Sequence, residues 1–303
     1  MAIIVENKQQ AKPVIKWAGG KYKLSKIILE VSEQKFDFSK FDSYIEPFIG
    51  GGGMFFAMTN KYEFKKKIIS DINPELINMY IQIRDDNQLL VEALKNIENE
   101  FNSLEDSEAK KGYYLNLRNE FNKGIDLEEY SIKQASLFIA INKLGFNGLY
   151  RVNRYGHFNV PFGQKKVASL VDEDNFKRVS EILADTEIVI ADFKTSVKYA
   201  NEKALYYFDS PYRPLPNSPS FTSYAKSEFN DESQRELAEV CKKIVDKGGK
   251  FILSNSDPVQ VDPNDTFFDD LYLDFDIERI QARRAIGATA ARRGMVSEIL
   301  VTG

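Results

Sequence analysis

Short apolar runs alternate with longer periodic ones along most of the chain. The short runs are rich in Ile, Val, Tyr and Phe and end in turn or polar residues, which is typical of buried strands; they cover residues 43–49, 66–71, 187–192, 204–209, 249–255 and 297–303. Helical patterns separate them, at "LSKIILEVSEQ", "PELINMYIQIRDD" and "DESQRELAEVCKKIVDKGG". Alternating strands and helices predict an α/β fold with a mostly parallel, doubly wound sheet.

The alternation stops between about residues 74 and 185. This region is polar and helical up to about residue 144, and it then becomes aromatic and rich in glycine and asparagine, in "GFNGLYRVNRYGHFNVPFG". We therefore expect a second, mostly helical domain at 74–172, inserted into a main domain that is formed by 1–73 and 173–303.

The composition is that of an ordinary soluble globular protein, with 303 residues of which 43% are apolar and 28% are charged. The longest apolar runs are far shorter than a membrane span and no leader pattern opens the chain, so we expect a cytoplasmic protein without membrane contact. The single cysteine, Cys241, excludes an internal disulfide. With one histidine, His157, a zinc cluster is not expected, and we predict chemistry without a metal.

The net charge of −4 hides an uneven distribution of charge. Residues 131–171 contain no acid, although the chain has 45 acids, and they carry Lys133, Lys143, Arg151, Arg154, Lys165 and Lys166. A second basic cluster near the C-terminus consists of Arg279, Arg283, Arg284, Arg292 and Arg293. Charge runs are usually solvated surface, but an acid-free window of this length favours a surface that faces a polyanion.

Four consecutive glycines follow the first predicted strand, in "EPFIGGGGMFF" (46–56). Glycine lets a ligand approach the backbone at the carboxyl end of a strand, where open α/β sheets bind cofactors. The spacing does not fit the dinucleotide fingerprint, because Phe55 stands where the third glycine of that motif should be when the count starts at Gly50. A tight turn without a ligand is the alternative.

Asp71 ends the second predicted strand, about 20 residues beyond the glycines. A carboxylate at this place can accept hydrogen bonds from the paired hydroxyls of a nucleoside ribose, which both NAD and S-adenosylmethionine carry. The alternative role is to cap the helix that begins at Pro74.

The segment "KWAGGK" (16–21) precedes the first predicted helix. Its ammonium, its indole and its flexible Gly19–Gly20 turn could hold a carboxylate and pack on an aromatic or sulfonium group. A structural role for Trp17 in the core is the alternative.

Asp209, Ser210, Pro211 and Tyr212 end the apolar run that begins at Ala204. An amine on a heteroaromatic ring is a poor nucleophile, because its lone pair is delocalised into the ring. A carboxylate and a backbone carbonyl that accept its two hydrogens favour a pyramidal nitrogen, while a tyrosine can stack on the ring and a proline can fix the loop. The pattern indicates a site that activates an amine; an Asp-initiated turn with an aromatic plug is the alternative.

These motifs occur, together with "SDIN", "ADF" and "NKLGFNGLYRVNRYGHFNVPFG", in the order found in Dam-type DNA adenine-N6 methyltransferases, whose target-recognition domain lies between cofactor and catalytic motifs. The chain resembles this family over almost its whole length, including "SFTSYAKSEFNDESQRELAE" and "RRAIGATAARRGMVSEILV". The resemblance implies a Rossmann-like sheet and transfer of methyl from S-adenosylmethionine to adenine N6 in double-stranded DNA, within GATC, after base flipping. Ser210 departs from the usual Asp-Pro-Pro-Tyr, which should keep the carbonyl acceptor but loosen the loop.

The resemblance also implies roles for individual residues. Cofactor-binding positions are Trp17, Lys21, Phe48, Gly50, Asp71, Asp192, Phe193 and Asp209, with Asp192 and Phe193 serving the cofactor's adenine. The catalytic motif is Asp209, Ser210, Pro211 and Tyr212, of which Asp209 and Tyr212 would hold the flipped base. DNA-binding positions are Lys16, Phe146, Asn147, Leu149, Arg151, Asn153 and Arg154, with Phe146 as an intercalating wedge. A cognate restriction endonuclease, without required physical contact, is a further partner in such systems.

Two other functions stay open from the residues. Cytosine-N4 methylation uses similar amine chemistry, usually with Ser at the first motif position, so Asp209 favours adenine. A catalytically silent DNA-binding or RNA-binding protein is disfavoured because Asp209 and Tyr212 are both present. A covalent cytosine-C5 mechanism would need a cysteine in a loop, whereas Cys241 falls in the helical pattern "LAEVCKKIV".

Overall fold

The computed structural model describes residues 10–213, 229–283 and 295–303, and these form one sheet with the strand order β3-β2-β1-β4-β5-β7-β6. The parallel strands are β1 (Ser43–Glu46), β2 (Lys66–Asp71), β3 (Thr186–Ile190), β4 (Ala204–Phe208) and β5 (Lys250–Ser256). β6 (Asp276–Arg283) and β7 (Met295–Thr302) extend the sheet in antiparallel fashion beyond β5. The predicted mostly parallel α/β sheet is confirmed.

Two details of the sheet differ from the sequence pattern. The first and third parallel strands are shorter than expected, because β1 ends before Pro47 and β3 ends at Ile190, after which Asp192 caps the 3₁₀-helix η4 (Phe193–Tyr199). β6, at the edge of the sheet, has no counterpart among the predicted strands. Its sequence "DIERIQAR" mixes charges with single apolar residues, which an edge strand tolerates because it pairs on one side only.

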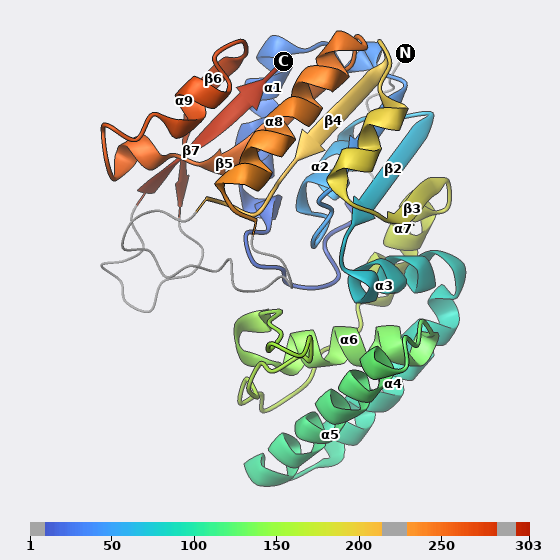
Figure 1. Cartoon of the computed structure of the whole chain (residues 1–303). Coiled ribbons are helices and arrows are strands. Elements are labelled where there is room, and N and C mark those ends of the chain that lie inside the picture. The colour runs from blue at the N-terminus through green and yellow to red at the C-terminus, as the bar shows by residue number, and fades with distance from the viewer. Residues whose placement is uncertain (1–9, 214–228, 284–294) are drawn as a thin grey trace.

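The central strand β4 buries both of its faces. All five residues of β4 are buried; Leu205 and Tyr207 point into one hydrophobic core, and Tyr206 and Phe208 point into the other. The first core lies under α1 (Ser25–Lys35) and α2 (Gly53–Lys61), and the second lies under α8 (Asp231–Asp246) and α9 (Phe267–Leu271). Figure 1 shows α8 on the near face of the sheet and α1 and α2 on the far face.

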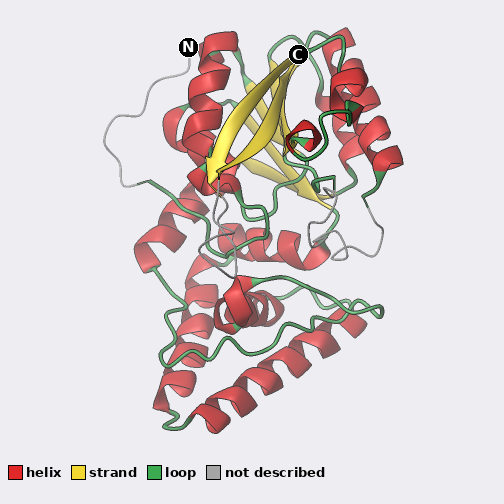
Figure 2. Cartoon of the chain, turned by 90° about the vertical axis from the view of Figure 1, so that its left-hand side faces the viewer, coloured by secondary structure: helices red, strands yellow, loops and turns green. Residues whose placement is uncertain are grey.

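The remaining helices are α3 (Pro74–Asp85), α4 (Asn87–Ser103), α5 (Ser107–Asp126), α6 (Ile132–Leu144) and α7 (Glu173–Leu183). α3 and α7 pack on β3, while α6 packs against α3, α4 and α5. Figures 1 and 2 show that α4, α5 and α6 extend away from the sheet below the carboxyl ends of its parallel strands. None of the helices in the described ranges is both long and apolar enough to cross a membrane.

The glycine run between β1 and α2 forms a turn that requires glycine. Gly52 has a φ of +74°, in the left-handed region, and a Cβ there would lie 2.8 Å from the ring of Phe56 and 2.9 Å from the hydroxyl of Tyr80. Gly50 has a φ of +47°, and a Cβ there would lie 2.8 Å from Trp17 Cδ1. The turn therefore presses the backbone directly against the segment that holds Trp17.

We predict that Gly52→Ala lowers the free energy of unfolding by at least about 1–3 kcal/mol, because the alanine is strained at this φ and collides with two buried rings. The control is Gly112→Ala in α5, where a Cβ would meet no atom within 4 Å and should raise stability by up to about 1 kcal/mol. Thermal and urea unfolding of the two variants measure both effects. Equal stability of the two variants would contradict the strain assigned to this turn.

Candidate active site

The carboxyl ends of the parallel strands β1, β2 and β4 carry the glycine turn, Asp71 and Asp209, in line with the rule that open α/β sheets place their sites at this edge. Lys21, from the short helix η1 (Lys21–Lys23), reaches the same edge from the start of the chain. The fold thus brings four of the sequence motifs together: the glycine turn, Asp71, the segment 16–21 that carries Lys21, and the motif that begins at Asp209.

The Lys21 ammonium is buried between a carboxylate and an aromatic ring. Its Nζ lies 3.1 Å from Asp209 Oδ1, and it donates a hydrogen bond to the carbonyl of Gly19 at 3.1 Å. The same nitrogen stands 4.1 Å from the ring centroid of Tyr212. Burial raises the pKa of the Asp209 carboxyl, and Lys21 opposes that rise, so the cation is what favours the carboxylate form.

Glu298, in β7, completes this cluster. The Tyr212 hydroxyl donates to Glu298 Oε2 at 2.6 Å, and that oxygen lies 3.8 Å from Lys21 Nζ. Burial, reinforced by Glu298, holds the pKa of Tyr212 well above its usual value, so the phenol stays a donor. Glu298 is not among the residues predicted from the motifs, because a single acid inside the apolar run "SEILV" carries no pattern of its own.

A second carboxyl lies nearby, and no lysine or arginine of the described residues pairs with it. Glu46 ends β1, is 2% exposed, and accepts a hydrogen bond from the Tyr44 hydroxyl at 2.7 Å. Burial raises its pKa well above the usual value, and the charge of Asp209 adds to the rise. Burial therefore favours the protonated form of Glu46, whereas Lys21 favours the carboxylate form of Asp209.

Asp71 binds the backbone of the glycine turn. Its carboxylate accepts hydrogen bonds from Gly50 N at 3.3 Å and from Asn73 N at 3.0 Å, and burial raises its pKa to about 6. It does not cap α3: Asn73 does, by accepting a hydrogen bond from Leu76 N at 3.1 Å. The alternative in which Asp71 is the helix cap is wrong.

Trp17 is half-buried: it packs against the first hydrophobic core and stacks on Tyr150, with ring centroids 5.1 Å apart. Further along the same edge, Phe48 stacks on Phe193 at 5.2 Å. Asp192 is exposed beside them and accepts a hydrogen bond from Lys194 N at 2.9 Å. Asp192, the rings of Phe48 and Phe193, and the glycine turn therefore line the sheet edge between Trp17 and η4.

The buried amide of Asn142, on α6, joins the start of the chain to the segment after α6. It accepts from Lys16 N at 3.1 Å and donates to Lys16 O at 2.9 Å and to Gly148 O at 3.0 Å. Gly148 has a φ of +64°, and a Cβ there would lie 2.8 Å from Lys16 Cβ. Lys16, Phe146 and Asn147 are exposed around this junction, and Leu149 is half-buried. Asn142, like Glu298, is not among the residues predicted from the motifs, because it is a single polar residue within an apolar helix.

Arg151 and Arg154 are exposed, and each has a partner within the segment. Arg151 donates to Asn159 through Nε at 2.6 Å and Nη2 at 3.0 Å, and Arg154 donates to the Tyr155 hydroxyl at 2.6 Å. The side-chain oxygen of Asn153 accepts from the backbone N–H groups of residues 155 and 157, so it shapes a turn.

Not every cation of the two basic clusters faces solvent. Lys143 is half-buried and donates to Leu170 O at 2.7 Å, and Arg279 pairs with Asp257 and Asp269, so neither belongs to a free basic surface. Lys165 and Lys166 are exposed. Arg284, Arg292 and Arg293 lie outside the described residues.

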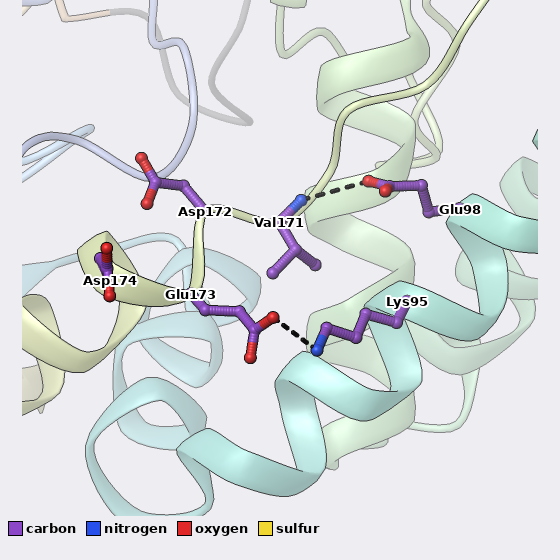
Figure 3. Close-up of a pocket in the computed structure, with 6 residues that line it drawn as sticks. All are labelled: Lys95, Glu98, Val171, Asp172, Glu173 and Asp174. Atoms are coloured by element: carbon purple, nitrogen blue, oxygen red, sulfur yellow. Dashed lines mark hydrogen bonds and ion pairs between the residues drawn. The ribbon is translucent and has the colours of Figure 1, made fainter.

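Two further features are structural. A pocket of about 450 Å³ between α4 and α7 is lined by Lys95, Glu98, Val171, Asp172, Glu173 and Asp174 (Figure 3). Three of its four acids are engaged within the protein, since Glu173 pairs with Lys95 at 2.6 Å, Glu98 accepts backbone N–H groups and Asp172 caps α7. Cys241 is buried in α8 and burial raises its pKa far above the usual value, which confirms it as a structural thiol.

We predict that Asp71 makes stability depend on pH. A folded-state pKa of about 6, above the unfolded value of about 4, means that the native protein must ionise a buried acid as pH rises through this window, so wild-type stability falls there. Asp71→Asn removes that cost. The difference in free energy of unfolding between Asp71→Asn and wild type should therefore shift in favour of the variant by up to about 3 kcal/mol from pH 4 to pH 7. Urea unfolding at both ends of the window measures this, and a pH-independent difference would contradict it.

Comparison with known proteins identifies the family. A model of the D12 class of N6-adenine-specific DNA methyltransferases matches residues 17–286. A type II methyltransferase of Methanocaldococcus jannaschii is 41% identical, with 94% of this chain and 96% of that protein covered. A type II methyltransferase of Lactococcus lactis subsp. cremoris is 36% identical, with 100% and 99% covered.

A DNA adenine methylase of Haemophilus influenzae is 31% identical, and the match covers 97% of this chain and 94% of that protein. The family resemblance read from the motifs is therefore confirmed, and so is the expected donor, S-adenosylmethionine. The bare glycine backbone, the acid Asp71 and the paired rings of Phe48 and Phe193 fit such a donor, which carries a ribose and an adenine. The chain belongs to the D12 class of N6-adenine-specific DNA methyltransferases.

Proposed function

We propose that this enzyme methylates adenine within GATC in double-stranded DNA after flipping the base, and that Asp209 and Tyr212 hold the flipped base. The observation that carries the assignment is the buried cluster of Lys21, Asp209 and Tyr212, in which a carboxylate and an aromatic face lie side by side. Bound S-adenosylmethionine supplies an electrophilic methyl group, and the residues of the chain prepare the amine that receives it.

Asp209 acts on the amine by hydrogen bonding. Its carboxylate and a backbone carbonyl of the loop accept the two N6 hydrogens, which draws the nitrogen towards a pyramidal geometry and frees its lone pair for attack. Lys21 keeps Asp209 ionised before the base arrives, against the rise in pKa that burial causes. The raised pKa of Glu46 favours its protonated form, which reduces any competing negative charge beside Asp209.

Lys21 stands over one face of the Tyr212 ring, which leaves the other face for stacking on the base. Glu298 offers the ammonium a second carboxylate, whose oxygen is already 3.8 Å from Nζ. The same oxygen holds the Tyr212 hydroxyl, which keeps the ring in place for stacking.

Six of the eight cofactor positions expected from the motifs follow the sheet edge, and the other two, Lys21 and Asp209, face the cofactor from the cluster that holds the base. Asp71 accepts hydrogen bonds from ribose hydroxyls, Asp192 and Phe193 serve the adenine ring, and Trp17, Phe48 and Gly50 complete the walls. The hydrogen bond from Gly50 N to Asp71 and the stacking of Phe48 on Phe193 support this arrangement.

We assign DNA recognition to the inserted region 74–172, together with Lys16. Phe146 is 51% exposed at the tip of a turn, as a base-stack wedge requires, and Arg151 is held in a fixed orientation by Asn159. The junction at Asn142 ties Lys16 to this turn.

Two relatives carry the name type II methyltransferase, which supports a partner restriction endonuclease in the same system. The DNA substrate supports a place in the cytoplasm.

We predict that Asp209→Ala abolishes methyl transfer while the protein stays folded, because both the acceptor for the amine and the partner of Lys21 are lost. Digestion of treated DNA to nucleosides followed by mass spectrometry measures N6-methyladenine and would also reveal N4-methylcytosine, the product of the alternative reaction. Turnover comparable to wild type in the variant would rule out the proposed site.

We predict that Arg151→Ala lowers kcat/KM on GATC much more than on sites that are altered at the base pair that Arg151 contacts. An arginine that donates two hydrogen bonds to a guanine discriminates by about 1–3 kcal/mol, whereas a phosphate contact weakens all sequences alike. The measurement is kcat/KM on GATC and on each single-base variant, with exposed Lys165→Ala as the control that should weaken binding evenly and reduce its salt dependence. If Arg151→Ala slows every substrate by one factor, Arg151 contacts phosphate.

A further inference from the structure

Two buried side-chain amides hold the loop that follows β4. Gln234 lies on α8 and Asn255 on β5, and both are 0% exposed. Gln234 Nε2 donates to Pro211 O at 3.0 Å, and Asn255 Nδ2 donates to the Ser210 hydroxyl oxygen at 3.2 Å. The two amides also bond to each other, from Asn255 Nδ2 to Gln234 Oε1 at 3.3 Å.

Asn255 also fixes the far side of the loop. Its Oδ1 accepts a hydrogen bond from Arg213 N at 3.2 Å, and the neighbouring Ser256 hydroxyl donates to Arg213 O at 2.9 Å. Ser210, Pro211 and Arg213 are therefore each tied to a neighbouring element. A buried amide without partners would be costly, so this network favours one loop conformation over all others.

The hydrogen bond from Asn255 to the Ser210 hydroxyl concerns the position at which this chain has serine and the usual motif, Asp-Pro-Pro-Tyr, has proline. A proline would restrict the backbone through its ring, whereas a serine leaves it freer. Ser210 is 2% exposed and its hydroxyl is bonded to Asn255, a contact that proline cannot make. The looser loop expected from Ser210 is therefore offset by a hydrogen bond.

We propose that Gln234 and Asn255 are positioning residues for methyl transfer. They fix the backbone from Ser210 to Arg213 so that the Asp209 carboxylate and the loop carbonyl converge on the same amine, and misplacement of such groups by about 1 Å can cost about a hundredfold in rate. The proposal rests on the assignment of Asp209 and Tyr212 to the reacting base. It adds that the geometry of the loop is set from α8 and β5.

The test compares Gln234→Met and Asn255→Ala with Asn175→Ala, a matched control. Asn175 is a buried amide on α7 that bonds both backbone groups of Lys12, each at 2.9 Å. All three variants should lose similar thermal stability. Only the first two should lower kcat, by about five- to tenfold per lost hydrogen bond, with cofactor affinity and the KM for DNA nearly unchanged. If kcat falls no more than in Asn175→Ala, the two amides serve stability alone and the proposal is overturned.

Ser210→Pro gives a readout that a purely structural role would not move. The proline ring should restrain the loop in place of the lost hydrogen bond between Asn255 and Ser210. Ser210→Pro, introduced into Asn255→Ala, should therefore recover most of the kcat that the single variant loses. If kcat does not recover, the role given to this hydrogen bond is overturned. If Asn255→Ala does not fold, Gln234→Met and Ser210→Ala carry the same comparison. Activity in Asp209→Ala would reject the site assignment itself, whereas an inactive Asp209→Ala beside unaffected Gln234→Met and Asn255→Ala rejects only the positioning role.

Discussion

The buried ion pair between Lys21 and Asp209 is the interaction on which the arrangement of the site depends. A charge removed from water is costly unless it is paired, and removal of one partner from a buried pair typically costs about 3–5 kcal/mol. Lys21 comes from the start of the chain and Asp209 from the end of β4, while Glu298, on β7, adds a second carboxylate. The ion pairs of this ammonium with Asp209 and Glu298 therefore connect three distant segments of the chain at one edge of the sheet.

The glycine turn and the amide of Asn142 further fix the position of the segment that carries Lys21. Gly50 and Gly52 let the turn lie against Trp17 and Tyr80, where any side chain would collide. Asn142 satisfies both backbone groups of Lys16 and also binds Gly148. The segment that carries Lys16 and Lys21 is thus bound to the sheet and to the helical region at once. In the proposed function, this junction lets DNA contacts and the amine site share one rigid element.

The charge distribution fits an acidic protein that acts on DNA. Many of the 45 acids are used within the molecule, as helix caps or as partners of lysines and arginines, for example Asp106 on α5 and Asp231 with Arg213. The acid-free window 131–171 leaves Arg151, Arg154, Lys165 and Lys166 exposed. Average net charge therefore says little about binding to a polyanion, because local clustering sets the field at the surface.

The sequence by itself determined the fold class and the family, and it predicted the edge of the sheet at which we propose the chemistry. Periodicity marks buried strands because each of them must fill two cores, and the motifs at the strand ends, such as Asp71 and Asp209, are local in sequence. Only the tertiary structure decided their partners. Glu298, Asn255, Gln234 and Asn142 are single polar residues within apolar or helical patterns, and their roles come from long-range hydrogen bonds that no local spacing encodes. Likewise, Lys143 and Arg279 read as surface charge in the sequence but are engaged in the fold, because burial and pairing are properties of packing.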